Sequence, residues 1–346
     1  CCERCGTTVI QRNLYQWFFK ITYYAEQLLD GHNKIDWPDE TILKQKNWIG
    51  KSEGAEVIFK IVDNNEEEIK VFTTCPDTLF GVTYIVLAPE HSLVDKITKP
   101  EFKIGVDAYR ESTKKLTEIE RTSTVKEKTG VPTGAFAINP VNGEKIPVWI
   151  ADYALITYGT GCVMAVPAHD ERDFEFAKKF KLSIRKVILQ AGTSEADELK
   201  SAFSEVGTMI NSEQFNGVQS DEGITNVIKY LEENSFGKGK INYRLRDWLI
   251  SRQRYWGTPI PIIHCPTCGE VPVEESELPI KLPYDVDFKL GGESPLARNA
   301  KYINVKCPKC GTDAKRDPDT MDTFVDSSWY YLRFLDPNIS TSAFNQ

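Results

Sequence analysis

Two short cysteine motifs constrain the fold of this chain more than any other feature of its sequence. Residues 265–269 and 307–311 both read Cys-Pro-x-Cys-Gly. In such a turn both thiolates point at one centre, and two turns together supply the four tetrahedral ligands of a zinc site. Four sulfur ligands leave no open position, so we predict a structural zinc rather than a catalytic one. Its ligands would be Cys265, Cys268, Cys307 and Cys310; the alternative is four reduced thiols without a metal.

The other cysteines give weaker signals. Cys2 and Cys5 form a third Cys-x-x-Cys pair, but no partner pair is left for them in the sequence. We interpret them as a half-site whose other ligands lie upstream in a longer protein, so bound metal is not expected here. Cys162 lies in an apolar stretch and is expected to be an inert core thiol. The sequence contains no stretch of the signal-peptide type and no other sign of a secretory context, so disulfides are not expected.

The overall charge of the protein excludes few classes of function. Lys and Arg number 42, Asp and Glu number 50, and the net charge is −8. The protein is therefore not a generally basic nucleic-acid binder, although a local patch can still bind phosphate. No apolar run approaches the length of a membrane span. A sequence of 346 residues is long enough for about two or three domains.

The pattern of predicted secondary structure changes near residues 51 and 240. Before the first change, residues 16–29 have apolar positions at helical spacing and predict a helix. After the glycine-rich joint at 237–240, residues 248–256 again predict a helix. The two changes divide the sequence into three segments, and the cysteine motifs lie in the last.

The middle segment is rich in strands. Residues 55–62 and 69–74 predict a hairpin, and residues 170–180 predict an amphipathic helix. Strands and helices are mixed without a regular β-α-β repeat. This pattern favours a mixed, barrel-like α/β domain over a doubly wound sheet.

A charged corner follows the apolar strand that ends at Pro167. The next helix begins near Asp170, and acids in the first turn of a helix favour its dipole, so capping alone can explain Asp170 and Asp173. Capping needs only one acid, however, and this turn has three acids beside His169 and Arg172. A carboxylate at such a corner can also pair with an ammonium group.

A second segment, residues 72–81, supplies hydroxyl groups. Thr73 and Thr74 can be explained by strand propensity alone. Thr78 follows Pro-Asp in a turn-like stretch, where that explanation is weaker. Three hydroxyls at one strand end can bind an ester carbonyl, a ribose or a small side chain.

These two segments resemble the two core motifs of the editing domain of leucyl-tRNA synthetases, whose family forms are TTRPDT and GTGAVMAVPAHDERD. Isoleucyl and valyl enzymes have related motifs, but residues 164–173 resemble the leucyl form. Residues 47–54 resemble the linker into that domain, and residues 242–257 resemble the return into the catalytic core. Residues 322–331 resemble the leucine-pocket segment. The resemblance covers nearly the whole sequence.

The resemblance implies an α/β fold, with a mixed, barrel-like editing domain inserted into part of a class I synthetase Rossmann core and a small zinc ribbon. Residues 1–50 would be a partial zinc knuckle and connecting helix of the catalytic body. Residues 51–240 would be the editing domain. Residues 241–346 would be the second part of the core, with the zinc ribbon at 264–315.

The resemblance also implies roles for individual residues in the editing site. Asp173 would pair with the α-ammonium of a misattached amino acid, and Thr78 would exclude leucine. Thr73 and Thr74 would line the scissile ester. Further contacts to the substrate or the tRNA end are expected from Tyr158, Met164, Val166, Asp170 and Arg172. The synthetic leucine pocket of the intact enzyme would include Phe324, Ser327 and Tyr330.

Position 75 departs from the family, which has Arg where this protein has Cys75. That Arg is expected to contact the terminal phosphates of the tRNA, and a neutral thiol cannot donate charge-assisted hydrogen bonds. One alternative is therefore an editing-impaired domain. Cys75 as a covalent nucleophile is disfavoured because no His is placed to activate it. Direct attack by a positioned water on the ester is the expected mechanism.

The implied partners are tRNA-Leu and the amino-acid moiety of mischarged tRNA, with no membrane. The resemblance implies a cytoplasmic monomer. ATP and Mg would act only in the intact enzyme, because HIGH-type and KMSKS-type segments are not present here, so aminoacylation by these 346 residues alone is not expected. Two alternatives stay open: a zinc-dependent tRNA-binding module without chemistry, and an editing domain of the valyl or isoleucyl type.

Overall fold

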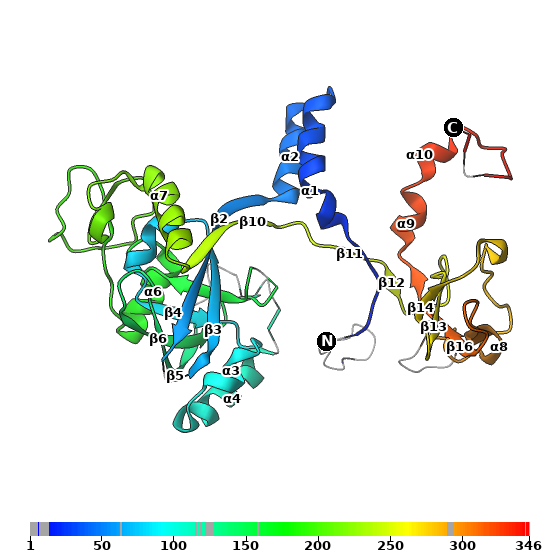
Figure 1. Cartoon of the computed structure of the whole chain (residues 1–346), viewed down its shortest axis with the longest axis horizontal. Helices are drawn as coiled ribbons and strands as arrows, with labels where there is room; N and C mark the ends of the chain where they lie inside the picture. Colours follow the sequence, from blue (N-terminus) through cyan, green and yellow to red (C-terminus); the bar gives the residue numbers. More distant parts are fainter. Residues whose placement is uncertain are drawn as a thin grey trace. The chain divides into compact units, whose positions relative to one another are not determined.

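The computed structural model describes residues 6, 14–62, 64–114, 116–117, 120–121, 128–157, 159–288, 294–342 and 344–345 (Figure 1). Two predicted sites lie outside these residues: the Cys2–Cys5 half-site and Tyr158. The protein divides into two compact units. Unit 1 contains Asp36–Arg244, and unit 2 combines Arg12–Ile35 with Leu245–Gln346.

Unit 1 is built on one mixed sheet. Its strands are β2 (Lys51–Ile61), β3 (Asn64–Thr73), β4 (Tyr84–Leu87), β5 (Gly130–Ile138), β6 (Lys145–Ala151), β7 (Cys162–Ala165) and β10 (Gly237–Tyr243). The order is β10-β2-β5-β6-β4-β7, with β3 paired to β2; among these described strands, only β4 and β6 run parallel. The predicted hairpin is confirmed as β2 and β3, with Ala55 opposite Thr73.

The barrel-like form predicted for this domain is corrected to an open sheet. β3 passes close to β7, so the sheet curves around its core. Within the described part of the protein, however, no ladder of hydrogen bonds joins β3 to β7. A barrel requires every strand to pair on both edges. The mixed α/β class holds, and the closed form does not.

Helices cover the core of this sheet, which includes fully buried Val57, Phe59, Leu79 and Ile85. The predicted helix at 170–180 is confirmed as α6 (Glu171–Phe180). The other helical elements of unit 1 are α2 (Asp39–Ile49), η3 (Pro76–Gly81), α3 (Leu93–Ile97), η4 (Pro100–Phe102), α4 (Lys103–Thr113), η5 (Glu213–Phe215) and α7 (Ser220–Glu233). A small hairpin joins β8 (Ile188–Leu189) to β9 (Thr208–Met209). Among the described helices, none has the length and apolar character needed to cross a membrane.

In the part of unit 2 that the structure describes there are three small sheets. Its four-stranded sheet has the order β14 (Gly269–Pro272), β13 (Ile262–Cys265), β16 (Asp313–Arg316) and β15 (Asn304–Lys306). Two strand pairs join β1 (Phe18–Phe19) to β11 (Trp248–Leu249) and β12 (Ser251–Arg252) to β17 (Thr320–Met321). The helical elements are η1 (Ile21–Tyr24), α1 (Ala25–Gly31), η2 (His32–Lys34), η6 (Glu275–Glu277), α8 (Ala300–Ile303), α9 (Thr323–Ser327) and α10 (Tyr330–Arg333).

In unit 2 one helix prediction fails and another is confirmed only in part, for the same reason. The predicted helix at 248–256 is wrong, because this stretch contains β11 and β12. The predicted helix at 16–29 is confirmed only from Ile21, since β1 precedes it. Each of these strands pairs with a segment that is distant in the sequence, as Phe18 does with Leu249 and Ser251 with Met321. Such long-range pairing overrides a local helical pattern.

Candidate functional site

The charged corner of unit 1 begins at the helix cap of α6. Asp170 accepts hydrogen bonds from the backbone N–H groups of Arg172 (2.9 Å) and Asp173 (3.2 Å). Its carboxylate also pairs with the Arg172 guanidinium at 3.0 Å, and that side chain is half exposed. Capping therefore accounts for Asp170, as one interpretation of the sequence proposed. It does not account for Asp173.

Asp173 lies on the inner side of the same turn, with 2 % of its surface exposed. Its Oδ2 accepts a hydrogen bond from Val166 N–H at 2.9 Å, and its Oδ1 accepts one from the Tyr153 hydroxyl at 3.2 Å. Burial, followed by the negative charge of Asp170, raises the pKa of Asp173 to about 7, although its hydrogen bonds and Arg172 act in the opposite direction. The carboxyl group of Asp173 therefore changes charge near neutral pH.

The hydroxyl segment runs from the end of β3 into η3. Thr73 Oγ1 accepts a hydrogen bond from Cys75 N–H at 3.0 Å, and the Thr78 hydroxyl donates to Cys75 C=O at 2.8 Å. Thr78 is buried, whereas Thr74 and Cys75 are exposed. These bonds fold the segment into a tight turn that presents Thr74 and Cys75 outward.

The surroundings of Cys75 disfavour the thiolate form of its side chain. Desolvation, together with the charges of Asp77 and Asp170, raises its pKa, although a contact with Thr74 acts in the opposite direction. A thiol with a raised pKa is a poor nucleophile at neutral pH. β3, which leads into the hydroxyl segment, passes close to β7, which leads into the charged corner, so the two segments start from neighbouring strands.

The hydroxyl segment and the charged corner also lie close together on their buried side. β4 pairs with β7, and Thr83 N–H donates to Ala165 C=O at 3.1 Å. A Cβ atom added to Gly81 would lie 3.1 Å from Val166 Cγ1, so glycine allows this close approach. Met164 and Val166 are both buried and form the wall behind the corner.

The sequence alone suggested no role for Asp77, a buried acid in the hydroxyl segment. Asp77 is 6 % exposed, and its Oδ1 has no hydrogen-bond partner among the described residues. Burial raises the pKa of Asp77 to about 6, against hydrogen bonds from its own N–H and from that of Thr78. The sequence shows an acidic residue beside Thr78 in a predicted turn, but it does not show that this residue is buried.

Both ring nitrogens of His169 form hydrogen bonds with backbone groups. Its Nε2 accepts from the N–H groups of Val187 (3.0 Å) and Ile188 (3.1 Å), and its Nδ1 donates to Phe203 C=O (2.8 Å). Burial lowers its pKa. A neutral ring with both nitrogens engaged is a structural group, so His169 is not placed to act as a general base.

The cysteines of unit 2 meet as the sequence predicted. Their four Sγ atoms all lie within 4.8 Å of one another, and Cys265 Sγ and Cys310 Sγ are 3.6 Å apart. The four residues are Cys265 and Cys268, around the turn between β13 and β14, and Cys307 and Cys310, in the turn between β15 and β16. Tetrahedral coordination with bonds of about 2.3 Å requires sulfur atoms roughly 3.8 Å apart, so the cluster fits a metal ion with four sulfur ligands.

The residues expected at a leucine pocket lie in unit 2, whereas the charged corner belongs to unit 1. Phe324 is 71 % exposed on α9 and Tyr330 is 61 % exposed on α10, and Ser327 at the end of α9 is exposed too. The described residues therefore do not enclose these side chains in a pocket. Trp329 and Tyr331 beside them are also exposed.

Comparison with known proteins relates both units to one family. A family model described as the leucyl-tRNA synthetase editing domain matches residues 46–232, and a model of class I tRNA synthetases matches residues 217–346. Leucine–tRNA ligases of Clostridium kluyveri and Caldanaerobacter subterraneus subsp. tengcongensis are 57% and 59% identical over 345 residues. The match covers 100% of this protein and 42% of each relative. The 346 residues therefore span less than half the length of these relatives.

A solved structure is similar over the same extent. It is a crystal structure of the ternary complex of Agrobacterium radiobacter K84 agnB2 LeuRS with tRNA and LeuAMS. The similarity has a TM-score of 0.78 and a sequence identity of 42%, and it covers 99% of this protein and 39% of that one.

Proposed function

Because the chain belongs to the leucyl-tRNA synthetase family and carries its editing domain, we propose that unit 1 hydrolyses the ester bond of tRNA-Leu charged with a wrong amino acid such as isoleucine or norvaline. A hydrophobic pocket distinguishes such side chains from leucine by only ~1–3 kcal/mol. A second, hydrolytic site raises fidelity beyond that limit.

The proposal depends mainly on one observation, the meeting of a hydroxyl segment with a buried acid corner. β3, which leads into the first segment, passes close to β7, which leads into the second, and Val166 lies close to Gly81 on the buried side. In this arrangement Thr73 and Thr74 would line the ester, and Thr78 would exclude leucine. Met164 and Val166 would shape the pocket, with Arg172 and Tyr158 near the tRNA end.

Asp173 retains the capacity to bind an ammonium group. An ionised carboxylate has about four acceptor positions, and among the described residues Val166 N–H and the Tyr153 hydroxyl use one on each oxygen. An α-ammonium bound there would favour the charged form of a carboxylate whose pKa is about 7. Binding of the substrate would therefore ionise the carboxyl group of Asp173, which anchors it.

The hydrolytic step would be attack by a positioned water. His169 is occupied by the backbone, and the raised pKa of Cys75 keeps that thiol protonated. Ester hydrolysis then depends on alignment of water and ester, with threonine hydroxyls and backbone N–H groups stabilising the oxyanion.

The remaining roles concern the longer enzyme. There, leucine would be attached to tRNA-Leu with ATP and Mg, and Phe324, Ser327 and Tyr330 would line the leucine pocket once further parts of the protein cover them. The division into 1–50, 51–240 and 241–346 would be that of a catalytic body interrupted by an editing domain. A monomeric state is part of the same proposal.

The deciding experiment measures hydrolysis of isoleucyl-tRNA-Leu by the 346-residue protein. Asp173→Ala should reduce the rate by ~10²-fold or more, since an interaction with a buried charge is lost. Asp221→Ala is the matched control, because Asp221 also lies in the first turn of a helix but is exposed on α7. Binding of tRNA without hydrolysis, unaffected by Asp173→Ala, would instead favour a binding module without chemistry. Hydrolysis of threonyl- or valyl-tRNA in its place would favour a valyl or isoleucyl type.

Four converging thiols also support zinc as the metal of unit 2. The ion would tie the β13–β14 turn to the β15–β16 turn and stabilise the four-stranded sheet. We expect elemental analysis to find bound zinc in the wild type, and loss of that zinc in Cys307→Ser. Cys75→Ser is the control, since Cys75 lies in the other unit.

A further inference from the structure

One tyrosine hydroxyl contacts the carboxylate of Asp173, and it comes from outside both sequence motifs. Tyr153 lies in the turn that follows β6 and is 4 % exposed. Its hydroxyl donates to Asp173 Oδ1 at 3.2 Å. Tyr84, on β4, donates instead to the backbone carbonyl of Asp173 at 3.1 Å. The two tyrosines therefore hold the same residue in different ways, one at its carboxylate and one at its backbone.

The turn that carries Tyr153 is held by a buried arginine. Arg121 Nε donates to Asp152 C=O at 2.8 Å, and its Nη2 donates to Ala154 C=O at 2.7 Å. The guanidinium thus binds the carbonyl groups on both sides of Tyr153. A planar fork with fixed donor directions suits such a double contact, which a lysine ammonium cannot reproduce.

Glu90 contacts the same guanidinium. Its carboxylate accepts from Arg121 Nη1 at 2.7 Å and from Nη2 at 3.4 Å. Arg121 itself is 6 % exposed, so its charge requires this partner. The turn is further fixed by the Asp152 carboxylate, which accepts from Thr129 N–H at 3.2 Å and from the Thr129 hydroxyl at 3.1 Å.

The ring of Tyr153 is fixed as well. It packs edge-on against Phe176 of α6, with ring centroids 5.7 Å apart. The Arg172 guanidinium lies 5.9 Å from the ring centroid. Because its backbone and its ring are both held, the hydroxyl of Tyr153 stays directed toward Asp173.

We propose that Tyr153 is a positioning residue for Asp173, and that the Glu90–Arg121 pair fixes Tyr153 for this role by holding the carbonyl groups on either side of it. This inference rests on the proposed function of Asp173 as the anchor of the substrate ammonium. The hydroxyl of Tyr153 favours the ionised form of the Asp173 carboxylate and fixes the position of its Oδ1. The Glu90–Arg121 pair is then part of the editing machinery although neither residue touches the substrate.

The effect of losing the hydroxyl can be derived from the groups that face Asp173. These are Asp170 and Arg172 at the start of α6, Tyr84 on β4 and Tyr153. Asp170 disfavours the ionised carboxylate, whereas Arg172, Val166 N–H and the Tyr153 hydroxyl favour it. Tyr153→Phe removes a donor and leaves the other groups in place. A higher pH is then needed to ionise Asp173.

The test is the pH dependence of isoleucyl-tRNA-Leu hydrolysis by the full 346-residue protein. In Tyr153→Phe the acid limb of the profile should move up by about one pH unit, a loss of about tenfold on that limb. Tyr230→Phe is the control, because Tyr230 of α7 packs against Phe215 and Phe236. A slower Tyr153→Phe enzyme with an unchanged profile would overturn the positioning role.

A second measurement separates failure of this inference from failure of the proposed function. Aspartate carboxyl groups labelled with ¹³C report the titration of Asp173 by NMR whether or not the protein hydrolyses anything. The Asp173 titration should move upward in Tyr153→Phe and, by a smaller shift, in Arg121→Lys. Absence of hydrolysis in every variant would sink the proposed function alone, whereas an Asp173 titration unchanged by Tyr153→Phe would sink the inference.

Discussion

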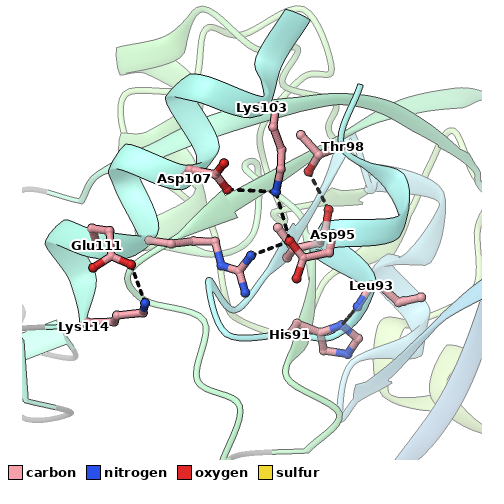
Figure 2. Close-up of polar contacts among 10 residues, drawn as sticks. His91, Leu93, Asp95, Thr98, Lys103, Asp107, Glu111 and Lys114 are labelled. Atoms are coloured by element: carbon pink, nitrogen blue, oxygen red, sulfur yellow. Dashed lines mark hydrogen bonds and ion pairs between the residues drawn. The ribbon is translucent and has the colours of Figure 1, made fainter. Parts of the chain in front are cut away.

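Unit 1 has two networks of charged side chains that use the same residue types in opposite environments. On the surface of α3 and α4, Asp95 pairs with Arg110 at 2.7 Å and with Lys103 at 3.1 Å, and Lys103 also reaches Asp107 at 2.9 Å (Figure 2). The second network is centred on buried Arg121, which pairs with Glu90 at the surface and supports the turn beside Asp173. The distances are similar, so geometry alone does not distinguish the two networks.

Burial does distinguish them. Arg110 and Lys103 lower the pKa of Asp95, as ion pairs in water do. Desolvation raises the pKa of Asp173 and Asp77 to about 7 and about 6, because the nearby donors do not offset it. Exposed ion pairs contribute little to stability, whereas a buried charge that loses its partner is costly. We therefore expect function and stability to depend on the inner network.

The largest effect should come from Arg121→Ala. This change leaves Glu90 and two buried carbonyl groups without their donor, and it should lower the free energy of unfolding by about 3 kcal/mol. Urea denaturation of unit 1 measures it. Arg110→Ala, the same substitution in the outer network, is the matched control and should change much less. Equal losses in the two variants would mean that burial does not separate the networks.

Asp77→Asn should have the next largest effect. A carboxyl whose pKa is about 6 when folded, against an ordinary 3.8, holds its proton better in the folded state. The free energy of unfolding therefore falls as pH rises from about 4 to about 6, and it stays lower above that range. The neutral amide should remove this slope and make the variant about 2 kcal/mol more stable at about pH 8. Thermal unfolding measured across this pH range tests the prediction. A variant whose stability depends on pH in the same way as that of the wild type would contradict the buried-acid account.

Cys75→Arg adds a charge at the exposed rim beside Asp170. The guanidinium can form charge-assisted hydrogen bonds to tRNA phosphates that a thiol cannot, so KM for isoleucyl-tRNA-Leu should fall by about five- to tenfold, with kcat changed less. Binding should also become more sensitive to salt. Cys75→Ser serves as the control. If the wild type hydrolyses nothing and Cys75→Arg restores hydrolysis, the alternative of an editing-impaired domain is correct.

The smallest effect is expected from Asp95→Asn in the outer network. Asp95 keeps 55% of its side chain exposed, so water screens both of its ion pairs. The urea midpoint at neutral pH should stay close to that of the wild type. Because the pKa of Asp95 is lowered, its small contribution should be lost as pH falls, opposite in direction to that of Asp77. A large loss at neutral pH would show that this surface network matters more than its exposure suggests.

The sequence by itself determined the features that depend on near neighbours. The two Cys-x-x-Cys turns, the β2–β3 hairpin and the cap of α6 by Asp170 each involve residues a few positions apart, or a turn between two strands. Local geometry is encoded locally, so these predictions are confirmed. The order of the motifs was also enough to identify the family.

Only the tertiary structure decided which of these residues are buried and what they contact. Tyr153 meets Asp173 across 20 positions, and Arg121 meets Glu90 across 31. The stretch at 248–256 contains two short strands instead of a helix because distant segments pair with it. The expected barrel stayed open because β3 and β7 do not pair among the described residues. Desolvation and long-range pairing depend on how the whole protein packs, and no pattern of neighbouring residues specifies them.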